Sequence, residues 1–222
     1  MCGRFTQIQS RDDYLAFLTD NVENDIPYDP EPIGRYNVAP GTKVLMLNNR
    51  NDTLHLDPVH WGYAPGWWDK PPLINARVET AATSRMFKPL WSHGRAIVFA
   101  DGWYEWKKDG DKKQPYYIYR KDKKPLYFAA IGKQPFDLGD EAEGFLIVTA
   151  AADKGLVDIH DRRPLVFAPD LAMEWMNPET TGARASELAH DAATPPDEFT
   201  WHPVTRVVGN VKNQGQELIN PI

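Results

Sequence analysis

The single cysteine of this 222-residue chain is its second residue, directly after Met1. If Met1 is removed, Cys2 carries a free amine and a thiol on adjacent carbon atoms. Such a 1,2-aminothiol condenses with an aldehyde to an imine, and the thiol then closes onto the imine carbon as a thiazolidine ring. Ordinary pKa values of about 7.7–8.0 for the amine and about 8.5 for the thiol leave part of each reactive near neutral pH. A chemically silent cysteine of a reduced cytosolic protein explains the position equally well.

A carboxylate between aromatic residues is the next candidate, in Asp101-Gly102-Trp103-Tyr104-Glu105-Trp106. On a strand, Trp103 and Glu105 share one face, and Tyr104 and Trp106 share the other. Aromatic surroundings exclude water from a carboxyl, which raises its pKa and suits it to general acid–base catalysis. The alternative is a surface glutamate at the mouth of a hairpin.

A histidine, an aspartate and two arginines follow one another in His160-Asp161-Arg162-Arg163. One interpretation is a histidine that titrates near neutral pH beside phosphate-binding arginines. The other is a loop whose charges pair with each other. The remaining histidines lack such neighbours, and we expect structural or surface roles for His55, His60, His93, His190 and His202.

Two adjacent tryptophans, Trp67 and Trp68, follow a Pro-Gly pair, a position where both are difficult to bury. An exposed indole stacks on unpaired bases, worth about 1–3 kcal/mol per base, although a loop that caps the core is the alternative. Shortly afterwards, Asn75 and Arg77 stand two residues apart. Asn75 is placed to orient a substrate, and Arg77 to hold a phosphate through two hydrogen bonds.

Composition limits the class of protein. Apolar content of 42% and charged content of 25% are ordinary for a globular domain. The sequence shows no apolar run long enough for a membrane span and no secretory signal, so we expect a cytoplasmic protein without membrane contact. One cysteine excludes a disulfide framework and a cysteine-rich zinc site. A net charge of −6 argues against nucleic-acid binding through global attraction, but not against a local basic cleft.

The pattern of elements predicts a single α+β domain over residues 1–222, with a β-rich, barrel-like core and a few peripheral helices. Expected helices span residues 11–19, 79–87, 169–176 and 183–190, and residues 27–40 are expected to form an ordered loop. Expected strands are residues 44–47, 54–56, 59–61, 96–100, 103–106, 116–119, 126–131 and 145–149. Asp109-Gly110 predicts a hairpin turn between two of them.

Taken together, these segments resemble the SRAP (SOS response-associated peptidase) family. The segments that carry the resemblance are Met1-Cys2-Gly3-Arg4-Phe5, Tyr36-Asn37-Val38-Ala39-Pro40, Trp61-Gly62, Asn75-Ala76-Arg77, Ala100-Asp101-Gly102-Trp103-Tyr104-Glu105-Trp106 and His160-Asp161-Arg162-Arg163-Pro164. The similarity extends along the whole chain and departs at no motif position. It implies the SRAP fold, removal of Met1 by an autopeptidase activity, and Schiff-base chemistry of the lyase type. Cys2 would then form a thiazolidine with the ring-opened sugar of an abasic site in single-stranded DNA.

The resemblance also assigns residues and partners. It implies that Asn75, Glu105 and His160 surround Cys2 as catalytic residues, without a metal or other cofactor. It implies that Arg4, Arg77 and Arg162 bind the DNA backbone, with Pro40, Trp67, Trp68, Arg85 and Thr149 along the same DNA path. We further expect a monomer that associates with the nucleoid at replication forks during the response to DNA damage.

Two other functions fit parts of the same sequence. An N-terminal-nucleophile amidohydrolase also uses a freed Cys2 thiol, but it needs glutamine-binding motifs and normally a synthase domain, and neither is evident. A non-covalent single-strand-binding module would use Trp67, Trp68 and the arginines. That function leaves the position of Cys2 unexplained.

Overall fold

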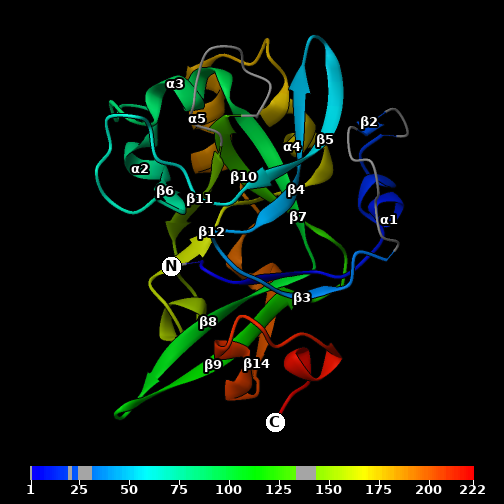
Figure 1. Ribbon diagram of the computed structural model, residues 1–222, viewed down its shortest axis with the longest axis vertical. Coiled ribbons are helices and arrows are strands. Elements are labelled where there is room, and N and C mark those ends of the chain that lie inside the picture. Colours follow the sequence, from blue (N-terminus) through cyan, green and yellow to red (C-terminus); the bar gives the residue numbers. More distant parts are fainter. Residues whose placement is uncertain (1, 20–21, 25–31, 134–143) are drawn as a thin grey trace.

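The computed structural model describes residues 2–19, 22–24, 32–133 and 144–222 (Figure 1). Its strands are β1 (Phe5–Gln7), β2 (Glu23–Asn24), β3 (Arg35–Val38), β4 (Lys43–Arg50), β5 (Thr53–His60), β6 (Asn75–Arg77), β7 (Arg95–Ala100), β8 (Gly102–Asp109), β9 (Lys112–Arg120), β10 (Leu126–Lys133), β11 (Gly144–Ala151), β12 (Arg162–Pro164), β13 (Val166–Phe167) and β14 (Phe199–Pro203). Its helices are α1 (Arg11–Leu15), α2 (Val78–Ala81), α3 (Lys88–His93), α4 (Pro169–Met176) and α5 (Gly182–Asp191), and short 3-10 segments are η1 (Leu156–Asp158), η2 (Pro196–Glu198), η3 (Arg206–Gly209) and η4 (Gln216–Ile219).

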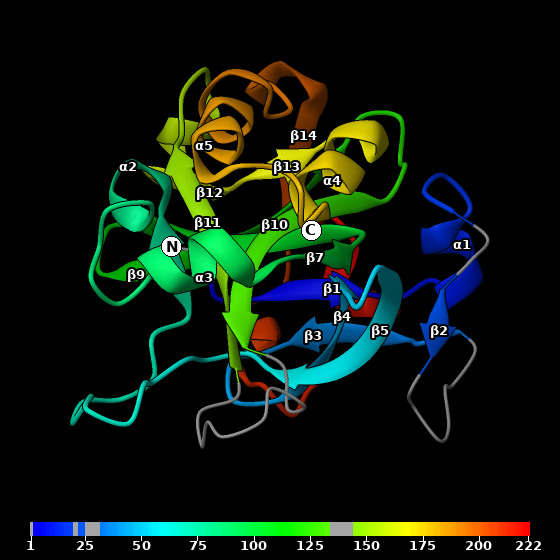
Figure 2. The same cartoon turned by 90° about the horizontal axis from the view of Figure 1, so that it is seen from above.

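The strands form two sheets. The smaller has the order β14-β9-β8-β1-β3, and the larger has the order β12-β11-β10-β7-β4-β5-β2. Two short strands extend the larger sheet, since β13 pairs with β10 and β6 runs parallel to β11. In Figures 1 and 2, α3, α4 and α5 gather on the larger sheet, while the smaller sheet lies beyond its other face.

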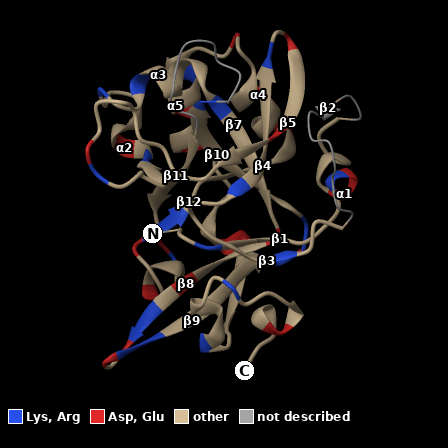
Figure 3. Ribbon diagram, viewed as in Figure 1, with Lys and Arg blue, Asp and Glu red and all other residues tan. Residues whose placement is uncertain are grey.

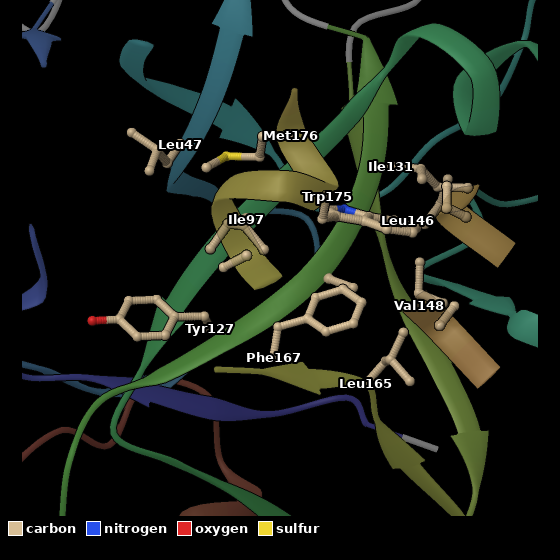
Figure 4. Packing of buried hydrophobic residues seen from close by; sticks show 14 of the residues in the cluster. Leu47, Ile97, Tyr127, Ile131, Leu146, Val148, Leu165, Phe167, Trp175 and Met176 are labelled. Carbon is tan, nitrogen blue, oxygen red and sulfur yellow. The ribbon is translucent and has the colours of Figure 1, made fainter. Parts of the chain in front are cut away.

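The central strand β7 shows why this layering follows from the sequence. All six of its residues are buried, and its side chains alternate between two hydrophobic clusters. Ile97 and Phe99 face the cluster that also holds Trp175 of α4, part of which Figure 4 shows. Val98 faces the cluster between the two sheets, which also contains Trp103 of β8. A strand covered on both faces is apolar throughout, which explains the uninterrupted run at residues 96–100.

The smaller sheet is covered on its outer face by the end of the chain. Tyr104 and Tyr117 pack there against Val208 and Leu218, which belong to the segments η3 and η4. The two sheets therefore share one core, and C-terminal residues close the far side. This arrangement confirms the expected α+β class, although the sheets stay open instead of closing into one barrel.

Several expected elements are confirmed. Strands cover all five predicted ranges from 96–100 to 145–149, and helices α4 and α5 match residues 169–176 and 183–190. The hairpin turn is also confirmed, because Asp109 pairs with Lys112 and Gly110 has a φ of 58°. Glycine reaches this left-handed conformation without steric cost. Of the described helices, none is long and apolar enough to cross a membrane.

The helix predicted over residues 79–87 is wrong in its extent. The helix α2 ends at Ala81, and a separate helix α3 begins at Lys88. Pro89 lies in the first turn of α3 and does not end a helix. The N–H groups of a first helical turn have no intrahelical acceptor, so a proline, which lacks this group, costs no hydrogen bond there. Proline therefore starts a helix as readily as it ends one.

The predictions for the first forty residues need two corrections. The helix expected over residues 11–19 ends at Leu15, and Ser10 caps its start by accepting a hydrogen bond from the Asp13 amide at 3.1 Å. In the loop expected over residues 27–40, residues 27–31 lie outside the described residues. Within the remainder, β3 is a strand, because its backbone pairs with β1.

The strands expected over 44–47, 54–56 and 59–61 are parts of two longer ones. β4 and β5 form a continuous hairpin from Lys43 to His60, closed at Asn51 and Asp52, which have φ values of 53° and 61°. Pro58 interrupts the sequence pattern but not the strand. The neighbouring β2 pairs with His55 and Leu56, and no described strand pairs with the outer edge of β5 at Pro58.

One buried cation joins the helical layer to the larger sheet. Arg95 of β7 is only 6% exposed. Its guanidinium donates to the carbonyl oxygens of Trp91 and Trp175, at 2.6 and 2.7 Å, and to those of Asn177 and Thr180. These carbonyls lie at or beyond the C-terminal ends of α3 and α4, where backbone oxygens have no intrahelical donor.

Replacing Arg95 with Met should therefore destabilise the fold by about 3–5 kcal/mol, because several buried carbonyls lose a charged donor. Urea unfolding followed by tryptophan fluorescence measures this loss. Arg184→Met is the matched control, since Arg184 pairs with Glu174 on the surface, where ion pairs contribute little. Equal stability of the two variants would contradict a structural role for Arg95.

Candidate active site

Cys2 lies directly before β1, in the core between the two sheets. Its side chain is completely buried. Asn75, at the start of β6, donates from Nδ2 to the Cys2 carbonyl oxygen at 3.1 Å and to that of Ile147 at 3.4 Å. Because β6 runs parallel to β11, with Asn75 opposite Ile147, the larger sheet holds Asn75 against the start of the chain. The predicted proximity of Cys2 and Asn75 is therefore observed.

Glu105 approaches the same place from the smaller sheet. The Tyr104 amide donates to the Arg4 carbonyl at 2.9 Å, which sets β8 beside the N-terminal segment. Glu105 is 2% exposed, and burial raises the pKa of its carboxyl to about 7. Burial, reinforced by the charge of Glu105, also raises the pKa of the Cys2 thiol well above its usual range. The thiol is therefore protonated at neutral pH, while Glu105 exchanges its proton there.

His160 follows the 3-10 segment η1, and its ring orientation is set by the backbone. Its Nδ1 accepts a hydrogen bond from the Arg162 amide at 3.0 Å and lies 3.0 Å from Oδ1 of Asp161. Burial lowers the pKa of His160, so the ring is neutral at neutral pH. Since Nδ1 is an acceptor, the proton of the neutral ring resides on Nε2.

Glu105 and His160 line a common pocket of about 480 Å³, together with Arg4, Trp106, Lys113 and Gly209. Burial raises the pKa of the Glu105 carboxyl to about 7, so this group titrates near neutral pH, and it lowers the pKa of His160, which keeps the imidazole neutral there. Such a pair provides a proton donor and a proton acceptor at one site. The walls thus combine acid–base groups with cationic side chains.

Arg4 has a structural role in this pocket as well as a place on its wall. Its Nη1 donates to Oδ1 of Asn37 and to the Val208 carbonyl, both at 2.8 Å. Its guanidinium also lies over the Trp106 ring, 5.6 Å from the centroid. Arg4 therefore connects the N-terminal segment with β3 and η3, and its predicted contact with DNA remains a prediction.

Arg77, Thr149 and Arg162 come together at one edge of the larger sheet. Arg77 is exposed at the end of β6, opposite Thr149 in register. Arg162 pairs with Glu79 through two hydrogen bonds, at 2.6 and 2.9 Å, and it donates to the Thr149 carbonyl at 2.7 Å. The sequence analysis did not anticipate Glu79, whose carboxylate would compete with a phosphate for Arg162.

Of the remaining predicted residues, Trp67 and Trp68 lie before β6, Arg85 lies after α2, and Pro40 lies between β3 and β4. Trp67 is 58% exposed, as expected for one indole of the pair, and its ring lies edge to face with that of Trp68. Arg85 lies over the Trp67 ring, 5.4 Å from the centroid, and Lys70 lies over that of Trp68. Pro40 is half-buried at the end of β3, beside Gly41, whose amide donates to the Trp61 carbonyl.

Three residues beyond the predicted set line the pocket: Trp106, Lys113 and Gly209. Trp106 stands in the predicted motif, and alternation places it on the opposite face of β8 from Glu105, yet it lines the pocket because Arg4 brings it there. Lys113 lies on β9 opposite Lys108, a cross-strand pairing that the hairpin turn implies. Figure 3 shows basic residues along this hairpin. Within the described ranges, His, Cys, Asp and Glu side chains form no cluster suited to a metal ion.

Comparison with known proteins places this geometry in a family. The family model for SOS response associated peptidase (SRAP) matches residues 1–211. The chain belongs to the SRAP family. The residues gathered around Cys2 are those by which the sequence resembles SRAP proteins.

The relatives of this SRAP chain carry a common name. It is 73% identical to the abasic site processing protein YedK of Escherichia coli K12 over 222 residues, with complete coverage of both chains. It is 31% identical to the abasic site processing protein YoaM of Bacillus subtilis, over 99% of this chain and 98% of the relative. The abasic site processing protein HMCES of Xenopus tropicalis is 29% identical, over 75% of this chain and 57% of the relative.

Solved structures agree with the SRAP fold described above. A phage-related protein from Bordetella bronchiseptica superimposes with a TM-score of 0.78 at 38% identity, covering 92% of this chain and 95% of the other. A protein from Bacteroides thetaiotaomicron superimposes with a TM-score of 0.77 at 20% identity, with complete coverage of both chains, which supports the fold alone.

The raised pKa of Glu105 predicts a measurable pH dependence of stability. The native carboxyl keeps its proton up to about pH 7, whereas an unfolded glutamate loses it near its ordinary value of 4.5. The native state thus binds more protons between these values, and the free energy of unfolding should fall as the pH rises through them. Glu105→Gln does not titrate, so between pH 4.5 and 8 it should gain about 3 kcal/mol relative to the unsubstituted protein.

Urea unfolding at a series of pH values measures this difference. Glu79→Gln is the control with the opposite sign, because the hydrogen bonds from Arg162 lower the pKa of Glu79. If the free energy of unfolding changed with pH in the same way for Glu105→Gln and for the unsubstituted protein, the Glu105 carboxyl would be hydrated. Glu105 would then no longer count as a member of the acid–base pair.

Proposed function

We propose that this chain is an abasic site processing protein, which captures abasic sites in single-stranded DNA as a covalent thiazolidine on Cys2. The observation that carries the proposal is the position of Cys2, whose carbonyl is held by Asn75 and whose thiol feels the charge of Glu105, a carboxyl that shares a pocket with His160. The relatives named above support the substrate. The crosslink shields the site from strand cleavage and serves the response to DNA damage.

The reaction begins with the loss of Met1, which frees the Cys2 amine. The amine adds to the aldehyde of the ring-opened sugar, and water leaves as the imine forms. The Cys2 sulfur then bonds to the imine carbon while the thiol proton passes to the ring nitrogen. An imine left open invites β-elimination at the sugar, so closure of the ring protects the DNA strand as well as capturing it.

The surrounding side chains suit these proton transfers. His160 presents its Nε2 proton for opening the closed form of the sugar. Glu105, with a pKa of about 7, accepts the thiol proton and passes it to the ring nitrogen, and the reverse transfer reopens the ring. Oδ1 of Asn75 is buried and receives no hydrogen bond from the described residues. An amine or sugar hydroxyl donating to that oxygen would be held in the reactive orientation.

The DNA path follows the exposed residues beside the pocket. Arg77 and Arg85 provide local positive charge on a protein with a net charge of −6. The exposed face of Trp67 supports single-strand binding, since a stacked base must first be unpaired. Trp68, Pro40 and Thr149 complete the path, with Arg4 and Arg162 as phosphate contacts. A monomeric state and association with the nucleoid at replication forks remain predictions.

The family name also raises the alternative of peptide or amide hydrolysis by Cys2. A hydrolase of that kind attacks through its thiolate. Burial raises the pKa of the Cys2 thiol, which disfavours the thiolate. We therefore propose that the peptidase activity is confined to removal of Met1 from this same chain, while the free aminothiol carries the function.

Substitution of Cys2 tests the chemistry directly. Cys2→Ala should abolish the heat-stable adduct with an abasic oligonucleotide, because no sulfur is present to close the ring. Cys2→Ser is the matched control, since its amine still forms an imine that borohydride traps. Denaturing gels and intact mass measure both products, and the mass also reports whether Met1 is present. A stable adduct of normal yield from Cys2→Ala would exclude the proposed function.

Substitution of Arg77 separates DNA binding from chemistry. Arg77→Ala should weaken binding to single-stranded DNA with or without a lesion, because one phosphate contact is lost. The slope of log K against log salt should decrease by about one. Fluorescence anisotropy across a salt series measures both quantities, with Arg184→Ala as the control on a remote helix. An unchanged slope for Arg77→Ala would move the DNA path away from β6.

A further inference from the structure

A second pocket, of about 360 Å³, opens on the helical side of the larger sheet, apart from Cys2. It lies between α2, the ends of β11 and β12, and the C-terminal end of α5. Its walls include Val78, Glu79, Ala150, Arg163, Leu165 and His190. The walls are mainly apolar, and the volume is within the range of about 300–1,000 Å³ typical of small-molecule sites.

Arg163 is the unusual member of this pocket. The residue is only 8% exposed. Nη1 donates to the Thr194 carbonyl at 2.9 Å, while Nε is buried without an acceptor among the described residues. Burial lowers the pKa of the guanidinium, partly offset by the charge of Asp153, which is exposed. A buried cation is ordinarily paired or fully hydrogen-bonded, so Arg163 lacks the partner that its burial calls for.

The acidic residue in the wall does not provide that partner. Both carboxylate oxygens of Glu79 accept hydrogen bonds from Arg162, and this pair is close to neutral. Arg162 and Arg163 are consecutive residues of the strand β12, so their side chains leave it on opposite faces. The charge of Arg163 therefore remains available to the pocket.

Nucleic acid, by the proposed path, passes close to the mouth of this pocket. Ala150 lies opposite Arg163 in register, directly after Thr149 on β11. Glu79 belongs both to the pocket and to the ion pair of Arg162 beside that path. The exposed His190, in the last turn of α5, adds a second donor.

We propose that this pocket binds a nucleotide through its phosphate group, with Arg163 as the phosphate-binding residue. The guanidinium, which lines the pocket, attracts the phosphate through its charge and donates hydrogen bonds to the phosphate oxygens. The apolar wall of Val78 and Leu165 accepts the sugar or base. The binding does not depend on the chemistry of Cys2, and the nucleotide is either free or part of the DNA strand.

Titration of the whole protein with deoxyadenosine 5′-monophosphate and with inorganic phosphate, followed by NMR, tests the site. Amide signals of residues 150, 163 and 190 should shift, and Arg163→Met should weaken the nucleotide affinity at least tenfold. Met retains the apolar stem and removes the charge. Arg184→Met, on the exposed face of α5, is the control and should bind like the unsubstituted protein.

Ala193→Phe keeps Arg163 and fills the pocket, so it tests the same site if Arg163→Met fails to fold. Loss of nucleotide binding in either folded variant supports the proposal. Absence of pocket shifts in the unsubstituted protein, or unchanged affinity in both variants, overturns it. No abasic DNA is present in this titration, so its outcome is separate from that of the Cys2 experiments.

A second arm identifies the source of the nucleotide. The pocket belongs to the DNA strand if an unmodified oligonucleotide displaces deoxyadenosine 5′-monophosphate from it. In that case the slope of log K against log salt for oligonucleotide binding should be about one lower for Arg163→Met than for the unsubstituted protein. An oligonucleotide that binds beside the nucleotide without displacing it assigns the pocket to free nucleotides. Both results support a phosphate site at Arg163.

Discussion

The pairing of β1 with β8 is the interaction on which the site depends. The Asp101 amide donates to the Thr6 carbonyl, and the Asp101 carboxylate accepts from the Ile8 amide at 2.7 Å. At the other end of β1, the Tyr104 amide donates to the Arg4 carbonyl. These bonds fix the first residues of the chain between two sheets. Chain ends are otherwise among the most poorly ordered parts of a domain.

The same burial tunes all three titratable groups near the N-terminus. Removal of water disfavours charge, so it raises the pKa of Cys2 and of Glu105 and lowers that of His160. At pH 7 the Cys2 thiol is therefore protonated and His160 is neutral, while Glu105 is divided between its two protonation states. Of the three groups, Glu105 is the one whose pKa lies closest to neutral pH.

Three arginines near the proposed DNA path have different surroundings, although the protein as a whole is acidic. Arg77 is exposed, Arg162 is neutralised by Glu79, and Arg163 is buried without a carboxylate partner among the described residues. Arg162 and Arg163 have different surroundings because the side chains of consecutive strand residues point to opposite faces of the sheet. The net charge of −6 thus says little about the nucleic acid that the surface accepts.

By itself, the sequence determined the elements with strong local signals: the apolar strand at 96–100, the turn at Asp109-Gly110 and the helix that begins at Pro169. It also singled out Cys2, Glu105 and His160 as candidates, because residue type and neighbouring residues indicate the chemistry that each side chain can perform. Only the tertiary structure decided which charges meet. The contact of Asn75 with Cys2 joins residues 73 positions apart, and the pairing of Glu79 with Arg162 joins residues 83 apart. Local spacing carries no information about contacts between distant elements, which the packing of two sheets and their helices determines.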